Sequence, residues 1–96
     1  MIIKKPIESQ STITIKTTGG DEIVARFIEE DNTTITIKKP LALMVTQQGI
    51  GLGPYVFTAD VDENIVINKS AIVFFTKTDK EMATQYMSST TGLAMA

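Results

Sequence analysis

Hydrophobic and polar residues alternate with a period of two through most of this chain, from Ser11 to Thr76. This period is typical of half-buried β-strands and excludes a helix over the same residues. Residues that favour turns, such as the pair Gly19 and Gly20, separate the alternating segments. The pattern therefore predicts a mainly β domain with five consecutive antiparallel strands. The expected strands are Ser11–Thr17, Glu22–Glu29, Thr33–Gln47, Tyr55–Ile67 and Ala71–Thr76.

Two of these strands are long and are expected to bend. The third contains Pro40, which cannot donate a ladder hydrogen bond and is therefore expected at an edge or a bulge. The fourth is expected to break near Asp62 to Asn64. The glycine-rich segment Gly49–Pro54 is expected to be a loop between the two strands. Long, bent strands joined in this way favour a small, strongly bent barrel.

The pattern changes after the fifth expected strand. Thr78 to Glu81 has the form of a capping box, with Thr78 as the cap and Glu81 reaching back to it. We expect a short helix over about residues 79–87, followed by a frayed tail. Its apolar residues Met82, Tyr86 and Met87 are expected to dock the helix on the barrel rather than to form a recognition surface.

The amino-acid composition excludes several kinds of functional site but does not identify a function. The 96 residues are expected to form a single domain, with 43% apolar residues to build a core. The chain has no Cys and no His, which removes disulfides, zinc thiolates, imidazole ligands and the commonest general base. We expect no enzyme, metal or cofactor. No segment approaches the roughly 20 apolar residues of a membrane span, so a cytoplasmic protein is expected.

Charge and local motifs give no strong catalytic or phosphate-binding site. The net charge of −2 offers no overall attraction for nucleic acid, so binding would need a local cluster. The glycines from Gly49 to Gly53 lack the Lys-Ser or Lys-Thr of a phosphate loop. Glu29, Glu30 and Asp31 alternate between faces and lack a third converging ligand, so they are expected to be a solvated strand end. Asp31 is expected to open a turn by accepting backbone hydrogen bonds.

The segment around the second strand resembles the first sequence motif of the Sm-like proteins, which include LSm proteins and bacterial Hfq. The positions that match this motif are Gly20, Ile23, Ala25, Phe27 and Asp31. Lys69, Ala71 and Ile72 also resemble the string that opens the last strand of Hfq, although Asn68 and Ser70 replace its Tyr and His. The family usually carries its helix before the first strand, and the Arg-Gly pair of eukaryotic Sm proteins is absent. As a whole, the chain resembles small Sm-like proteins of marine phages.

The resemblance implies a five-stranded Sm-like barrel, with SH3-like and OB barrels as the alternatives. It also implies a homo-oligomeric ring of about five to seven subunits, in which the fourth strand of one subunit pairs with the fifth of the next. The sequence supports such a contact, because the last strand is apolar on both faces and contains neither charge nor proline. The expected interface residues are Ile65, Val66, Ile67, Ile72, Val73, Phe74 and Phe75.

In Sm-like rings, two turns line the pore and bind bases of single-stranded RNA. The matching residues here are Asn32, Thr33, Asn68, Lys69 and Ser70. Lys69 can pair with phosphate, but Thr33 cannot stack on a base as the aromatic residue of the family does, so weak binding is expected. The first hypothesis is a ring that binds RNA weakly in RNA metabolism, inside the host cell if the chain is phage-encoded. The alternative is a structural or protein-interaction ring that has lost RNA binding.

Overall fold

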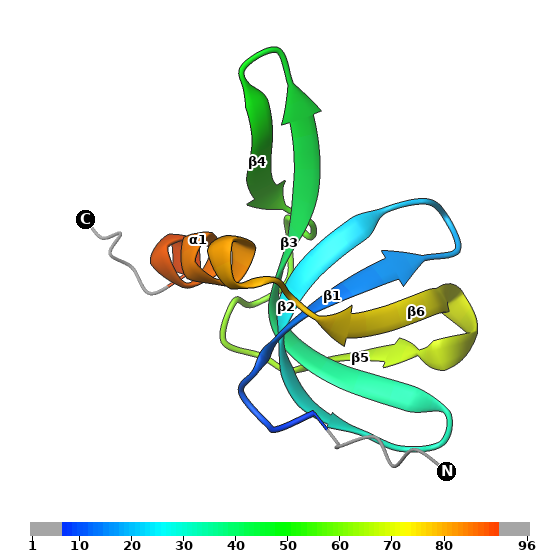
Figure 1. Cartoon of the computed structure of the whole chain (residues 1–96). Coiled ribbons are helices and arrows are strands. Elements are labelled where there is room, and N and C mark those ends of the chain that lie inside the picture. Colours follow the sequence, from blue (N-terminus) through cyan, green and yellow to red (C-terminus); the bar gives the residue numbers. More distant parts are fainter. Residues whose placement is uncertain (1–6, 91–96) are drawn as a thin grey trace, which may run out of the picture.

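The computed structural model describes residues 7–90, which form one β-sheet and one C-terminal α-helix (Figure 1). The expected mainly β class with a helix at the C-terminal end is confirmed. The tail expected after about residue 87 is helical up to Thr90, and the rest of it lies outside the described residues. The elements are β1 (Thr12–Thr17), β2 (Glu22–Glu30), β3 (Thr34–Thr46), β4 (Gly49–Pro54), β5 (Ile65–Asn68), a 3₁₀ turn η1 (Lys69–Ala71), β6 (Ile72–Lys77) and α1 (Lys80–Thr90).

The sheet is antiparallel, with the order β4-β3-β2-β1-β6, and β5 also pairs with β3. The first residues of β3, Thr34–Ile37, pair with β5, and Leu41–Thr46 pair with β4. The strands β4 and β5 therefore lie end to end along the same edge of β3. The expected count of five strands is wrong, because six strands fill five positions across the sheet. The sheet is also not closed, since no ladder joins β5 to β6 within residues 7–90.

The expected fourth strand from Tyr55 is wrong as well. The segment that was expected to be a loop is β4, and no strand occurs between Pro54 and Ile65. Gly49, with φ of 121°, closes a tight turn after Gln47 and Gln48, neither of which has a positive φ. Glycine accepts this positive φ because it has no Cβ to clash with the backbone. Thr46 stabilises the turn, because its Oγ1 donates to the Gly49 carbonyl at 3.1 Å.

A bulge in β3 confirms the expectation for Pro40. Val24 lies opposite Leu41, whereas Arg26 lies opposite Lys38, so Lys39 and Pro40 together oppose a single residue of β2. Lys39 has φ of 52°, in the left-handed region. Bulges bend a strand and increase its twist. Beyond this bulge the β3–β4 hairpin extends away from the rest of the sheet, as Figure 1 shows.

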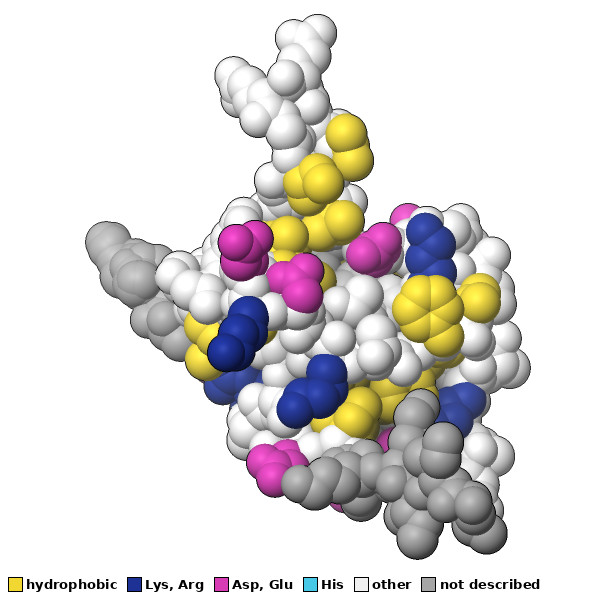
Figure 2. All heavy atoms as spheres, viewed as in Figure 1, with side chains coloured by type: hydrophobic (Ala, Val, Ile, Leu, Met, Phe, Trp, Pro, Cys, Tyr) yellow, Lys and Arg dark blue, Asp and Glu magenta, His cyan; other side chains and the backbone are white. Residues whose placement is uncertain are grey.

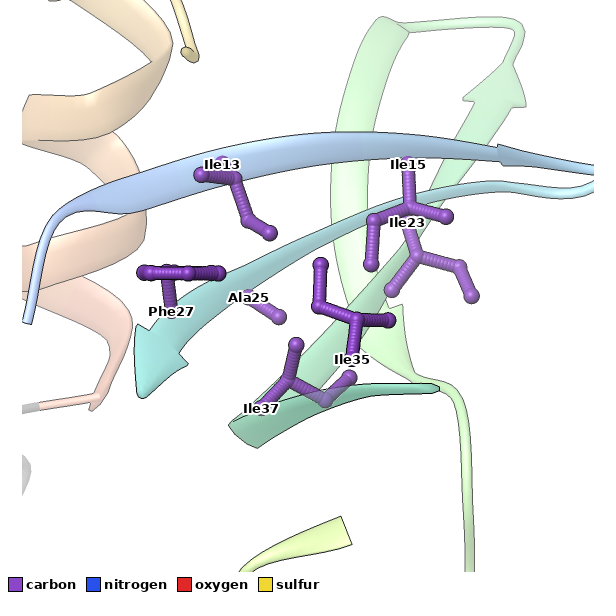
Figure 3. Packing of buried hydrophobic residues seen from close by; sticks show 7 residues of the cluster. All are labelled: Ile13, Ile15, Ile23, Ala25, Phe27, Ile35 and Ile37. Atoms are coloured by element: carbon purple, nitrogen blue, oxygen red, sulfur yellow. The ribbon is translucent and has the colours of Figure 1, made fainter. Parts of the chain in front are cut away.

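The main core lies on one face of β1, β2 and β3, where seven buried side chains point toward one another (Figure 3). Ile65, Ile67, Ile72 and Phe75 pack against its margin from β5 and β6. Burial does not extend along the whole of β3, because Val45 near its end is 80% exposed. The bulge carries the distal half of β3 away from the core. The seven core residues are Ile13, Ile15, Ile23, Ala25, Phe27, Ile35 and Ile37.

The helix docks through Tyr86, which is fully buried. Its hydroxyl donates to the carbonyl of Lys39 at 2.6 Å and to that of Lys38 at 3.2 Å, so it binds the β3 bulge. This contact confirms the docking role expected for Tyr86. Met87 is partly exposed, and its Sδ accepts a hydrogen bond from Arg26 Nη2 at 3.4 Å.

The helix begins one residue later than the capping-box pattern predicts. Asp79 is the cap, because its Oδ1 accepts the Met82 amide at 2.9 Å. Thr78 instead continues the strand geometry, with its amide donating to the Thr12 carbonyl at 3.1 Å. The helix continues past Met87 to Thr90, the last described residue. Within the described residues, no helix combines the length and the apolar character needed to cross a membrane.

Candidate functional site

The turn between β2 and β3 is organised by the Asp31 carboxylate. Its Oδ1 accepts the backbone amides of Thr33 at 2.9 Å and Thr34 at 2.8 Å, together with both of their hydroxyls. The predicted turn is therefore confirmed. The hydrogen bonds from Thr33 and then Thr34 lower the pKa of the Asp31 carboxyl below its ordinary value of 3.8. Asn32 and Thr33 are held exposed at the tip of this turn.

The turn before β6 lies beside the first one. Asn68 at the end of β5 pairs with Thr34 at the start of β3, and the Lys69 amide donates to the Thr33 carbonyl at 2.8 Å. The structure thus brings together the two turns that contain the expected RNA-binding residues. Asn68 and Ser70 are exposed, and Lys69 is partly exposed.

The charge of Lys69 is already compensated. Its Nζ lies 2.6 Å from Oε1 of Glu30 at the end of β2, and 6.0 Å from the centroid of the Phe75 ring. A phosphate that binds Lys69 must compete with this carboxylate, and Asp31 lies in the adjoining turn. The sequence does not predict this pair, because the two residues are 39 positions apart and meet only through the β3–β5 pairing.

The expected interface residues divide into two groups. Ile65, Ile67, Ile72 and Phe75 face the core margin. The others face solvent in the single chain. Their exposed fractions are 63% for Val66, 62% for Val73 and 52% for Phe74.

Both strands that carry these exposed residues are edges. Strand β5 pairs only with β3, and β6 pairs only with β1, so each has one side without a partner within residues 7–90. Val73 occupies a bulge, because Phe74 lies opposite Lys16 while Ile72 lies opposite Thr17. The C-terminal helix docks on the β3 bulge and leaves Val73 and Phe74 exposed.

A cavity of about 330 Å³ lies at the base of the hairpin, where β3, the segment 55–64 and the end of α1 meet. Its lining is mostly apolar and includes Leu41, Pro54 and Ile65. Lys39 and Asp60 are among its charged lining residues. No pattern in the sequence predicts this cavity, because its walls come from three separate segments.

The acidic strand end has no metal-binding geometry. Asp31 is engaged by its own turn, and Glu30 is paired with Lys69. In the part of the chain that the structure describes, no three Asp or Glu side chains come together in a way that could hold a metal ion.

Comparison with protein-family models and with curated proteins finds no match to this chain. Its function is therefore argued from the contacts described above.

Proposed function

We propose that the protein is a structural subunit that assembles with copies of itself through head-to-tail pairing of β5 with β6 of the next subunit. The observation that carries this proposal is the pair of open strand edges, which are uncharged over Ile65–Asn68 and from Ile72 to Thr76, with Val66 on one and Val73 and Phe74 on the other. Soluble proteins usually protect such edges with charge, proline or a covering element. Pairing between copies protects both edges at once.

The two edges belong to different strands, so the contact is heterologous and repeats from one subunit to the next. A repeated heterologous contact closes into a ring when the rotation between subunits permits it. The resemblance to Sm-like proteins supports a ring of about five to seven subunits built from small bent barrels. The arrangement of six strands in five positions is compatible with that architecture, with β4 and β5 together in the place of one long strand.

The test is a lysine at the bulged position of β6. Val73→Lys adds a charge to the open edge at an exposed side chain, so the subunit should still fold. Gln85→Lys adds the same charge on the exposed face of α1 and serves as the control. Sedimentation at micromolar concentration should show an oligomer for the wild type and the control. For Val73→Lys it should show a particle of lower mass, because the β5–β6 contact is lost. A monomeric wild type would reject the proposal.

RNA binding at the two adjacent turns is a second candidate function. It is supported by the exposed amides and hydroxyls of Asn32, Thr33, Asn68 and Ser70, which a ring would repeat around its axis. The pairing of Lys69 with Glu30 and the lack of an aromatic residue weigh against tight binding. For these reasons we rank it below the structural role.

Three variants test the RNA hypothesis by fluorescence anisotropy with uridine-rich RNA at low salt. Glu30→Gln should strengthen binding because it frees Lys69 for phosphate, and Lys69→Ala should abolish it. Thr33→Phe adds a stacking surface worth about 1–3 kcal/mol per base. If neither Glu30→Gln nor Thr33→Phe binds RNA, the structural role alone remains.

A further inference from the structure

The distal part of the β3–β4 hairpin, from Leu41 to Pro54, forms an arm without charge. No Lys, Arg, Asp or Glu occurs from Leu41 to Ala59, although the chain contains nine basic and eleven acidic residues. In Figure 2 hydrophobic side chains follow the stem of the hairpin, whereas charged side chains gather on the body below it. Soluble surfaces are usually interspersed with charge. The uncharged, largely apolar composition of this arm is therefore typical of a surface that another protein surface covers.

The two faces of the hairpin differ. On one face Ala42, Met44 and Thr46 lie opposite Gly53, Gly51 and Gly49, so β4 contributes no side chain there. The other face is entirely apolar. Its cross-strand pairs are Leu41 with Pro54, Leu43 with Leu52, and Val45 with Ile50. Val45 and Ile50 are 80% and 57% exposed, so this apolar face has no cover near the tip.

The outer edge of β4 is also open. Strand β4 pairs with β3 alone, and no other strand of residues 7–90 lies along its second side. Its only proline, Pro54, stands at the last position, so Gly49 to Gly53 all retain a backbone N–H. An edge without charge is a template for another strand. The occupant that fits this edge must therefore supply an extended backbone and an apolar face.

We infer that β4 pairs antiparallel with β4 of a second copy of this chain, about a twofold axis. With Gly51 opposite its own copy, Ile50 lies opposite Leu52 of the partner strand. Because an antiparallel pair keeps each parity on one face, the two apolar faces then join into one, and the two glycine faces join on the other side. The edge is self-complementary, as a twofold contact requires.

Charge also favours a second copy. Each chain carries a net charge of −2, and the uncharged arm lets two acidic copies meet without like charges at the contact. A lipid surface is a poorer occupant, because the tip of the arm is the polar pair Gln47 and Gln48. This twofold contact uses a different strand from the proposed β5–β6 contact. If the subunits form a ring, the twofold β4 contact joins one ring to a second ring. If they do not, it joins two chains into a dimer.

The experiment separates these two contacts. Ile50→Lys places a charge on the apolar face of β4, and Gln48→Lys places the same charge at the tip as a control. By sedimentation equilibrium at micromolar concentration, Ile50→Lys should halve the mass of the wild-type particle, and Gln48→Lys should leave it unchanged. Circular dichroism confirms that each variant is folded.

The same measurement in the Val73→Lys background makes the result independent of the proposed ring. There the β4 contact alone should give a dimer, and adding Ile50→Lys should give a monomer. A wild-type dimer that Ile50→Lys dissociates supports the β4 contact and rejects the ring. A Val73→Lys protein that is monomeric, or an Ile50→Lys particle of wild-type mass, overturns the inference.

Discussion

A single oxygen atom, Oδ1 of Asp31, organises the turn between β2 and β3. It accepts two backbone amides and two hydroxyls from Thr33 and Thr34. These bonds favour the ionised carboxylate and lower its pKa. The match of Asp31 to the Sm-like motif therefore has a sufficient structural cause, whatever the turn binds.

The Asp31 turn should make stability depend on acid pH. A group with a lowered folded-state pKa stabilises the fold above its unfolded-state value of 3.8, and this contribution is lost as the pH falls through the folded-state value. Asp31→Asn keeps an acceptor oxygen but does not titrate, so it should remove that part of the acid-induced loss. Urea unfolding between pH 7 and pH 2.5 measures the difference. Asp21→Asn, in the exposed turn after β1, is the control, and identical pH profiles for Asp31→Asn and wild type would contradict this account.

Tyr86 should make stability depend on alkaline pH. Burial of the phenol raises its pKa from 10.0 to about 12, while the positive charge of Arg26 acts in the opposite direction. Its contribution is fully present below pH 10 and is lost as the pH rises through about 12. Tyr86→Phe leaves the carbonyls of Lys38 and Lys39 without this donor and should destabilise the fold by about 1–3 kcal/mol near neutral pH. Denaturant unfolding from pH 7 to pH 11.5 should show both the lower stability and a weaker alkaline loss, whereas Tyr55→Phe, at an exposed side chain, should leave the stability near neutral pH unchanged.

At the scale of elements, the bulge in β3 decides the shape of the molecule. Lys39 adopts φ of 52°, and the Tyr86 hydroxyl binds its carbonyl. Left-handed backbone strains most residues by about 1–2 kcal/mol, and β-branched residues suffer more than lysine. The docked helix therefore holds the bulge, and the bulge sets the direction of the β3–β4 hairpin.

The strain at the bulge gives a matched pair of variants. Lys39→Val should cost on the order of 1 kcal/mol more stability than Lys38→Val, because of these two residues only 39 has a positive φ, where a β-branched side chain adds to the strain that lysine already carries. Both changes remove one lysine from adjacent positions of β3 and leave the backbone carbonyls in place. Chemical denaturation of the two variants measures the difference directly. Equal destabilisation would mean that the bulge does not impose the φ of Lys39.

The sequence predicted those elements whose cause is local. Strands β1 and β2 follow from alternation, the Asp31 turn from side-chain chemistry, and the bulge from Pro40. Strand β4 was missed because glycine is typical of loops, and its role as a strand depends on pairing with β3. The Glu30–Lys69 pair was missed for the same reason, since it depends on register rather than on either residue alone.

At the scale of the whole molecule, the single chain leaves much apolar surface uncovered. Its main cluster contains seven buried residues, and exposed apolar side chains occur on β3, β4, β5 and β6. Small domains bury a limited fraction of their surface and often gain stability by oligomerisation. Those on the strands lie on open edges and on the hairpin, so pairing of strands between copies can cover them without rearranging the core, whereas Phe57 and Val61 lie in the segment between β4 and β5.

Assembly should therefore be visible as concentration-dependent stability. Binding that occurs only in the folded state raises the melting temperature as the protein concentration rises. The wild type should show such a rise between about 1 and 100 μM, and Val73→Lys combined with Ile50→Lys should melt at the same temperature throughout this range. Differential scanning calorimetry measures both proteins. A melting temperature of the wild type that does not change with concentration would exclude a contact that stabilises the subunit.

Because β4 and β5 share one edge of β3, the length of the β3–β4 hairpin can change without a change in the rest of the sheet. Because β5 pairs with Thr34–Ile37 and β4 pairs with Leu41–Thr46, the register of one pairing does not fix that of the other. The ten residues from Tyr55 to Asn64 span the interval between them. Equal insertions in β3 beyond Thr46 and in β4 before Gly49 lengthen the arm by about 3.4 Å for each added pair. The arm can thus change its reach while the core and the β5 edge keep the same sequence.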